Sequence, residues 1–218
     1  MSRELRQPLE TTAFNELDLG VVEKKLQEPW WNLRWVTHAT QDQLFFASLS
    51  GRLTPSSGKV PCLYLAQNRE TAFQEIYGDD LDAAEKRSLP FYFIKKNLQN
   101  RLLLKTSGEV KVRVYDLSAE KGAKRIGMDL GTLYDALVNF PREFAQRLHD
   151  HPAKFDGIQY VSRQTQSLCI ILWATHSPAL KKIDLVLGSN LWDLVELGPR
   201  LPSGTLRLFN HAISVVDV

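Results

Sequence analysis

VPCLYLAQNRETAFQEIY, residues 60–77, is an apolar run followed directly by a polar segment. Residues 60–66 have the length and composition of a buried β-strand. A helix is predicted to begin after Gln67-Asn68, at Glu70, and to extend to about residue 87. Its apolar face is predicted to carry Phe73, Ile76 and Tyr77. The stretch therefore predicts a strand that leads directly into a helix.

Further strands and helices are predicted on both sides of this stretch. Strands are predicted at residues 30–36, 90–96, 110–117, 157–162 and 167–173, and helices at residues 12–27 and 130–149. Strands and helices are thus interspersed without a steady strand–helix–strand alternation. This order favours the α+β class over a doubly wound parallel sheet.

The length of the chain, 218 residues, suits a single domain. Residues 1–29 are predicted to be an N-terminal helical extension that Pro29 ends. The residues near one face of that helix are Phe14, Leu17, Val21 and Leu26. Residues 30–218 are predicted to form the domain itself, with a C-terminal extension after residue 173.

The charge of the chain is nearly balanced, because 27 basic and 25 acidic residues give a formal net charge of +2. A dedicated nucleic-acid-binding protein usually carries a strong basic excess. The N-terminus lacks the apolar core of a signal peptide, and no apolar run approaches the roughly 20 residues of a membrane span. We therefore expect a soluble, cytoplasmic protein, in which Cys62 and Cys169 are buried thiols.

Common cofactor and metal motifs are absent from the sequence. It contains no glycine-rich dinucleotide-binding or phosphate-binding loop, no HExxH and no paired CxxC. His149-Asp150-His151 is interpreted as a helix end before Pro152, where histidine suits the helix dipole. No metal site and no resident cofactor are therefore predicted.

Four segments share their order and spacing with the motifs of one family. They are Leu33-Arg34-Trp35-Val36, Gly51-Arg52, the pair Leu63-Tyr64-Leu65-Ala66 and Thr71-Ala72-Phe73-Gln74-Glu75, and Asp156-Gly157-Ile158-Gln159-Tyr160-Val161-Ser162-Arg163. Over these residues the chain resembles the RES family, named for its arginine, glutamate and serine. The sequence departs from the family pattern at Trp35, where tyrosine is usual, and at Leu53 and Thr54, where the family has an aromatic residue and an asparagine.

The resemblance implies a fold similar to ADP-ribosyltransferases, with mixed sheets flanked by helices. It implies a RES domain over residues 30–218, with its core motifs at residues 33–173. It also implies a toxin that uses NAD⁺ as its substrate and cleaves the nicotinamide–ribose bond. The implied partner is a cognate antitoxin with a helix-turn-helix domain, without direct contact of this chain with nucleic acid or membrane. A homo-oligomer is compatible with the sequence.

The chemistry of this bond explains the residue types that the resemblance assigns. Cleavage moves positive charge onto the ribose, as in glycoside hydrolysis, and an ionised carboxylate such as Glu75 would stabilise that charge. Guanidinium groups bind phosphate oxygens and remain charged, so Arg52 is expected as a catalytic clamp and Arg34 as a substrate-binding clamp. The other expected substrate-binding residues are the aromatic Trp35 and Tyr64 and the polar Ser162 and Arg163.

Several alternatives remain open at this point. By periodicity alone, Glu75 lies off the apolar helix face and is interpreted as a solvated glutamate. Hydrolysis, phosphorolysis and transfer to a protein all need the same cation-stabilising core, so a protein ADP-ribosyltransferase toxin is the alternative to an NAD⁺-degrading one. A non-catalytic RES-like binding module is the second alternative, supported by the departures at Leu53 and Thr54.

Overall fold

The strand–helix unit at residues 60–77 is present as β4 (Pro61–Ala66) followed by α2 (Arg69–Lys86). The structure is a computed structural model. It describes residues 14–26, 29–38, 45–47, 51–89, 91–118, 122, 125–126, 140–174, 183–195, 206–209 and 211–216.

Helix α2 begins where its sequence supplies an N-cap. The Asn68 backbone is extended, and its side-chain oxygen accepts a hydrogen bond from the Thr71 N–H at 2.8 Å. This bond satisfies one of the N–H groups that the first helical turn leaves unpaired. Phe73 is fully buried and Tyr77 is half-buried, but Ile76 is 42% exposed. The assignment of Ile76 to the apolar face is therefore wrong, because the helix is buried through other positions, namely Thr71, Ala72, Phe73, Gly78 and Leu81.

Nine of the described strands form one large mixed sheet. Its order is β1 (Val22–Leu26), β7 (Val110–Asp116), β8 (Gly157–Val161), β9 (Leu168–Trp173), β4, β2 (Trp31–Trp35), β6 (Arg101–Ser107) and β10 (Asp184–Asn190), with β3 (Phe46–Ala47) paired to β4. The β7–β8 pair is parallel and the other pairs are antiparallel. The sheet therefore places β4, which carries Tyr64, beside β9, and β9 beside β8, which leads directly into Ser162 and Arg163.

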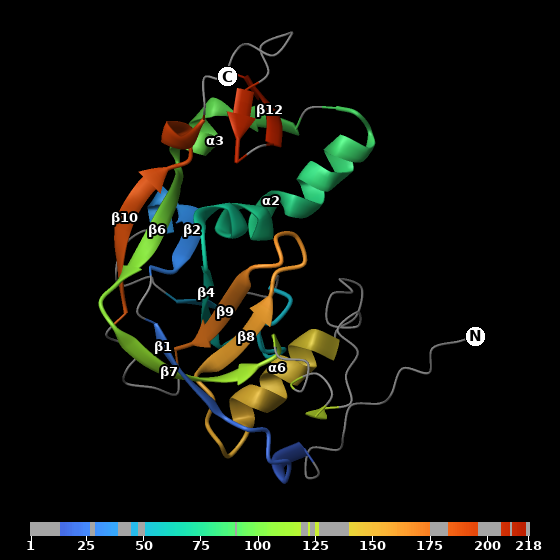
Figure 1. Ribbon diagram of the computed structural model, residues 1–218, viewed down its shortest axis with the longest axis vertical. Helices are drawn as coiled ribbons and strands as arrows, with labels where there is room; N and C mark the ends of the chain where they lie inside the picture. Colours follow the sequence, from blue (N-terminus) through green and yellow to red (C-terminus); the bar gives the residue numbers. More distant parts are fainter. Residues whose placement is uncertain are drawn as a thin grey trace, which may run out of the picture.

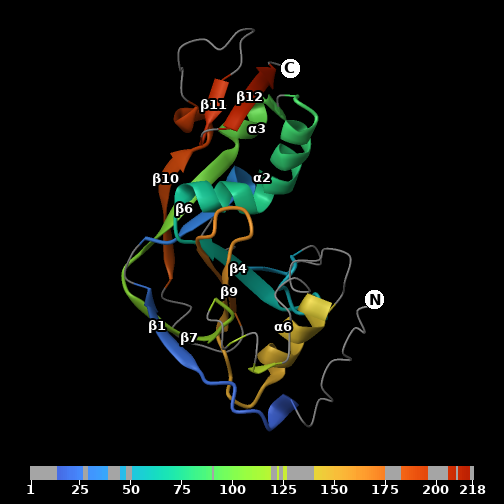
Figure 2. The same ribbon diagram turned by 45° about the vertical axis from the view of Figure 1, so that its right-hand side comes forward.

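A smaller sheet packs on the far side of α2. It consists of β11 (Leu206–Leu208), β12 (His211–Val216) and β5 (Phe91–Ile94), and β12 is the middle strand. In both views α2 lies between the two sheets, whereas α6 (Phe140–Asp150) lies near β8 (Figures 1 and 2). The short helix α3 (Lys95–Gln99) and the 3-10 turns η1 (Val36–His38) and η4 (Trp192–Leu194) complete the described elements. Helix α2 is thus covered from both sides.

The alternation of side chains along the strands separates two hydrophobic clusters. On β4, Cys62 and Ala66 belong to the larger cluster, which also contains Phe73 of α2 and Phe144 of α6. Leu63 belongs to the second cluster, on the opposite face of the sheet. Both faces of β4 are therefore buried, which explains why residues 60–66 are a continuous apolar run rather than an alternating one.

The helix predicted at residues 12–27 is wrong for most of the described residues: only 14–15 are helical, 16–21 are turn or irregular, and 22–26 form β1. Val22 to Leu26 pair antiparallel with β7, from Val22 opposite Val114 to Leu26 opposite Val110. Gly20 precedes the strand with a φ of +62°, a left-handed conformation that interrupts any helix. The apolar spacing of Leu17, Val21 and Leu26 is compatible with a helix, but pairing with β7 overrides it.

Other predicted elements are confirmed, with shifts at their ends. The strands at 30–36, 90–96, 110–117, 157–162 and 167–173 correspond to β2, β5, β7, β8 and β9. Of the helix predicted at 130–149, the second half is α6, and residues 130–139 lie outside the described residues. The α+β class is confirmed. Strands β6 and β10 were not predicted.

Two further features bear on the sequence-based expectations. Cys62 and Cys169 are buried free thiols, as predicted, and burial raises the pKa of Cys62 to about 12. Among the helices that the structure describes, none combines the length and the apolar character needed to cross a membrane.

Candidate functional site

The Glu75 carboxylate lies on α2 opposite the end of β8, where two hydroxyl groups bind it. Ser162 Oγ donates to Glu75 Oε1 at 2.6 Å, and the Tyr160 hydroxyl donates to Glu75 Oε2 at 2.9 Å. Glu75 itself is exposed, whereas Ser162 and Tyr160 are buried. Glu75 is therefore not a freely solvated helix glutamate: each carboxylate oxygen has a fixed donor on its protein side, and the side chain still reaches solvent.

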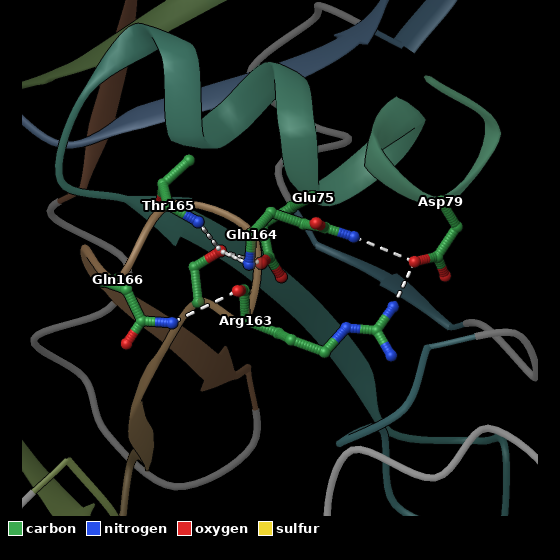
Figure 3. A network of polar contacts seen from close by, with 7 residues as sticks. Glu75, Asp79, Arg163, Gln164, Thr165 and Gln166 are labelled. Atoms are coloured by element: carbon green, nitrogen blue, oxygen red, sulfur yellow. Dashed lines mark hydrogen bonds and ion pairs between the residues drawn. The ribbon is translucent and has the colours of Figure 1, made fainter. Parts of the chain in front are cut away.

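The surroundings of Ser162 fix the direction of its hydroxyl. Its oxygen lies 3.3 Å from the Gln164 N–H and 3.4 Å from the Thr165 N–H, and it accepts a hydrogen bond from each. Since both N–H groups donate to the Ser162 oxygen, the hydroxyl proton of Ser162 is left for Glu75. Figure 3 shows Glu75 beside Gln164 and Thr165 of the β8–β9 loop. Ser162 therefore binds Glu75 as a hydrogen-bond donor in this structure.

Tyr160 lies in β8, and Ser162 follows directly after the last residue of that strand, Val161; the two hydroxyls reach the same carboxylate. Burial, together with the nearby negative charge of Glu75, raises the pKa of Tyr160 well above its ordinary value. The phenol therefore stays protonated at neutral pH and can serve as a hydrogen-bond donor.

The loop between β8 and β9 is attached to the first turns of α2. Thr71 Oγ1 and Thr165 Oγ1 lie 2.8 Å apart, and Asn68 Nδ2 donates to Ser167 Oγ at 3.2 Å. Farther along the helix, a Cβ atom on Gly78 would come within 2.7 Å of the Gln164 side chain. These contacts hold Glu75 and Ser162 at a fixed separation although they lie 87 residues apart in the sequence.

Arg163, expected to contact the substrate, is directed elsewhere. Its guanidinium donates to the Asp79 carboxylate, which also accepts a hydrogen bond from Gln164 Nε2 at 2.9 Å (Figure 3). Both members of this ion pair are substantially exposed, at 44% and 66% of their side-chain surfaces. The structure therefore does not bring the Arg163 guanidinium together with the Glu75 carboxylate.

Tyr64 and the Gly51-Arg52 turn form a second part of the site. The Tyr64 hydroxyl lies 2.8 Å from Thr54 Oγ1, and a Cβ on Gly51 would come within 2.1 Å of that hydroxyl oxygen. Burial raises the pKa of Tyr64, and the negative charge of Glu75 adds to this shift. Gly51 is therefore needed for close packing against Tyr64, and Arg52, the next residue in the chain, is half-buried.

Arg34 lies on β2 and is connected to Tyr64 through Asn32. Arg34 Nε donates to Asn32 Oδ1, and Asn32 Nδ2 donates to the Tyr64 carbonyl at 2.7 Å. Arg34 Nη1 also donates to the His38 carbonyl at 3.1 Å. Burial lowers the pKa of Arg34 to about 10, so the guanidinium remains cationic at neutral pH.

The Trp35 ring is already in contact with a positively charged side chain of this protein, that of Arg101. The Arg101 guanidinium carbon lies 3.8 Å from the centroid of the Trp35 ring, a cation–π contact. Arg101 therefore covers one face of this ring, and a ligand would have to use the other face. No cluster of three or more metal-ligating side chains occurs in the part of the chain that the structure describes.

The same residues carry a family signature. The model of the RES domain family matches residues 29–194, which is more than half of the chain. This chain belongs to the RES domain family. The match includes all the elements of the site, whereas β11 and β12 of the small sheet lie beyond it.

A solved structure supports the same fold for this RES domain. The crystal structure of the M. tuberculosis MbcT–MbcA toxin–antitoxin complex contains a chain similar to this one, with a TM-score of 0.55 and 17% sequence identity. The similarity covers 82% of this chain and 89% of that chain. It confirms the fold that the family resemblance implied. No curated protein sequence matches this one.

Three residues of this arrangement in the RES domain are not predicted as site residues from the sequence. Tyr160 belongs to the segment 156–163, and its spacing of two residues from Ser162 is the signal that indicates a shared direction of the two side chains. Thr54 was interpreted only as a departure from the family pattern, yet it binds the Tyr64 hydroxyl. Asn32 gave no signal in the sequence, because its role depends on the pairing of β2 with β4.

Proposed function

We propose that this RES domain is a toxin enzyme that cleaves the nicotinamide–ribose bond of NAD⁺, by hydrolysis or phosphorolysis. The observation that carries the proposal is the Glu75 carboxylate, which is exposed to solvent while both of its oxygens are held by hydroxyl donors. A carboxylate oriented in this way is suited to stabilise a cation that develops beside it.

The proposed chemistry uses the charge on Glu75 and leaves the departing group without assistance. Nicotinamide carries positive charge in NAD⁺ and leaves as a neutral molecule, so its departure needs no general acid. Positive charge then develops at the ribose, where the ionised Glu75 would stabilise it and could accept a hydrogen bond from a ribose hydroxyl. Water or inorganic phosphate would complete the reaction by attacking the anomeric carbon.

The proposed contacts with the rest of NAD⁺ come from the two arginines and Tyr64. Arg34 and Arg52 would bind the negatively charged pyrophosphate, because a guanidinium can offer two parallel donors to phosphate oxygens. Arg34 is connected to Tyr64 through Asn32, and Gly51, the residue before Arg52, packs directly on the Tyr64 hydroxyl. Both cations are thereby tied to Tyr64, whose ring would support the nicotinamide.

The proposed biological partner is an antitoxin protein with a helix-turn-helix domain. An enzyme that destroys NAD⁺ would harm the cell that makes it, so an inhibitor is needed. The structurally similar MbcT–MbcA pair is a toxin–antitoxin complex. An antitoxin that covers Glu75 would prevent access of NAD⁺ to the carboxylate.

Product analysis tests this proposal. Purified protein is incubated with NAD⁺, with and without inorganic phosphate, and the products are identified by mass spectrometry. We expect free nicotinamide together with ADP-ribose in water, or ADP-ribose 1″-phosphate when phosphate is the acceptor. Labelling of a protein by tagged NAD⁺ without free ADP-ribose would instead establish an ADP-ribosyltransferase. Absence of any turnover or labelling would support a binding module.

Arg34→Lys tests the expected pyrophosphate contact. Lysine keeps the charge, but its single ammonium group cannot reproduce the separate bonds to Asn32 and to the His38 carbonyl. We expect KM for NAD⁺ to rise about 10-fold or more, since hydrogen bonds to charged groups contribute roughly 1.5–3 kcal/mol. Arg113→Lys is the control, because this arginine is exposed on β7. An equal change of KM in both variants would refute a specific role of Arg34.

A further inference from the structure

We propose that Tyr160 is a positioning residue for Glu75, whose buried hydroxyl fixes the plane of the carboxylate relative to the substrate. The inference rests on the proposed function, since it concerns how Glu75 is aimed in that reaction. In this role Tyr160, on β8, acts through Glu75 and does not need to touch the substrate.

The first argument is the number of bonds that the carboxylate receives. With Ser162 alone bound to Oε1, the carboxylate plane could turn about the bond that joins it to the side chain. The second bond, from Tyr160 to Oε2, comes from another residue and removes this rotation. Both oxygens keep further lone pairs for a ribose hydroxyl, because an ionised carboxylate has about four acceptor positions.

The second argument is the rigidity of Tyr160. Strand β8 is paired on both sides, with β7 and with β9, and Tyr160 lies directly opposite Cys169 of β9. The Tyr160 side chain is 9% exposed, within the larger hydrophobic cluster. The hydroxyl position is therefore set by the backbone of the sheet, whereas Glu75 alone would be a flexible side chain on a helix surface.

The third argument is the difference in burial between the two residues that the hydrogen bond joins. Glu75 is exposed on α2, and Tyr160 is fixed beneath it. A buried phenol needs a partner for its hydroxyl, and the bond to Glu75 supplies this partner. Burial favours the protonated phenol, so the direction of donation, from Tyr160 to Glu75, does not change near neutral pH.

Tyr160→Phe tests the role, because it removes the hydroxyl and keeps the ring. We expect kcat for nicotinamide release to fall about 10- to 100-fold, the range expected when a reacting group is displaced by up to about 1 Å. KM for NAD⁺ should change less than about 3-fold, because the pyrophosphate contacts are unaffected. In a Glu75→Gln background the same change should have almost no effect, since Tyr160 acts through the carboxylate.

Tyr115→Phe is the matched control. Tyr115 is also a buried tyrosine on a neighbouring strand, and its hydroxyl donates to the Gly122 carbonyl at 2.6 Å, away from Glu75. A merely structural contribution of a phenol hydroxyl would affect the two variants alike. We expect Tyr115→Phe to lower thermal stability at least as much as Tyr160→Phe, while kcat stays close to the wild-type value.

A second readout does not depend on turnover. In protein labelled with ¹³C at the glutamate carboxyl carbon, the Glu75 resonance is assigned with Glu75→Gln. We expect this resonance to shift in Tyr160→Phe and to stay in place in Tyr115→Phe. The positioning role would be overturned if Tyr160→Phe left the Glu75 resonance unchanged or kept the wild-type kcat. It would also be overturned if Tyr160→Phe lowered the rate in the Glu75→Gln background by the same factor as in the wild-type protein. A shifted resonance in a protein that releases no nicotinamide would refute the proposed function and leave the orientation of Glu75 by Tyr160 supported.

Discussion

We expect Glu75→Gln to lower the rate of nicotinamide release from NAD⁺ by about 10²–10³-fold, the loss typical of removing a preorganised electrostatic group. Glutamine has nearly the same shape and can still accept hydrogen bonds at its oxygen. It carries no charge, so the cation that develops on the ribose loses its stabilisation. KM for NAD⁺ should change little, because this interaction strengthens only in the transition state.

Glu85→Gln is the control for the change of net charge. Glu85 lies on the same helix and is exposed, and it is placed in a turn far from β8. Initial rates of nicotinamide release, measured by mass spectrometry on both variants, give the comparison. Wild-type rates in Glu75→Gln would mean that the anion in this site has been assigned to the wrong residue.

Gly157→Ala should have the largest effect on stability. A Cβ atom at this position would lie 1.9 Å from the Ile171 carbonyl oxygen and 3.0 Å from Leu172 Cα, both of them backbone atoms of β9. A backbone in the middle of a sheet cannot move away as the end of a side chain can. We expect the free energy of unfolding to fall by about 3 kcal/mol, the upper part of the range for overpacking. The melting temperature should then fall by roughly 6–12 °C.

Gly108→Ala is the comparison for this prediction. Gly108 has no atom within 4 Å of a built Cβ, but its φ is +76°. Alanine there should cost only about 1–2 kcal/mol, from the left-handed backbone conformation. Thermal unfolding followed by circular dichroism measures both variants. Equal melting temperatures for the two variants would show that β8 and β9 are not packed as closely as the structure has them.

The sequence predicts the fold best where consecutive residues of a strand are all buried. β4 and β9 are buried on both faces, so their apolar runs are plain, and α2 has an N-cap that marks its first turn. Residues 22–26 were misassigned because the pairing with β7 is a contact between segments far apart in the chain. Strand β10 gave no signal either, because it lies at the edge of the sheet and most of its residues are exposed.

The site was accessible only in part, for a related reason. The family resemblance indicated Glu75, although its position off the apolar face predicts a solvated residue. The sequence also indicated Ser162, but as a contact for the ligand rather than as a donor to Glu75. Contacts between side chains of α2 and the β8–β9 loop depend on how the helix crosses the sheet, and no local pattern encodes that crossing. The bond from Tyr160 to Glu75 could not be read from the chain for this reason, and the bond from Asn32 to the Tyr64 carbonyl depends on the pairing of β2 with β4.

The small sheet has a consequence for the order in which the protein matures. Strand β12 is synthesised after every residue of the Glu75 site, yet it is the strand that pairs with β5 and supplies His211, which accepts a hydrogen bond from Gln74 beside Glu75. Phe209, which precedes it, packs 5.2 Å from the Phe73 ring. Because a chain leaves the ribosome from its N-terminus, α2 reaches its final packing only after β12 has emerged. Synthesis itself thus sets the earliest moment at which the packing of α2 is complete.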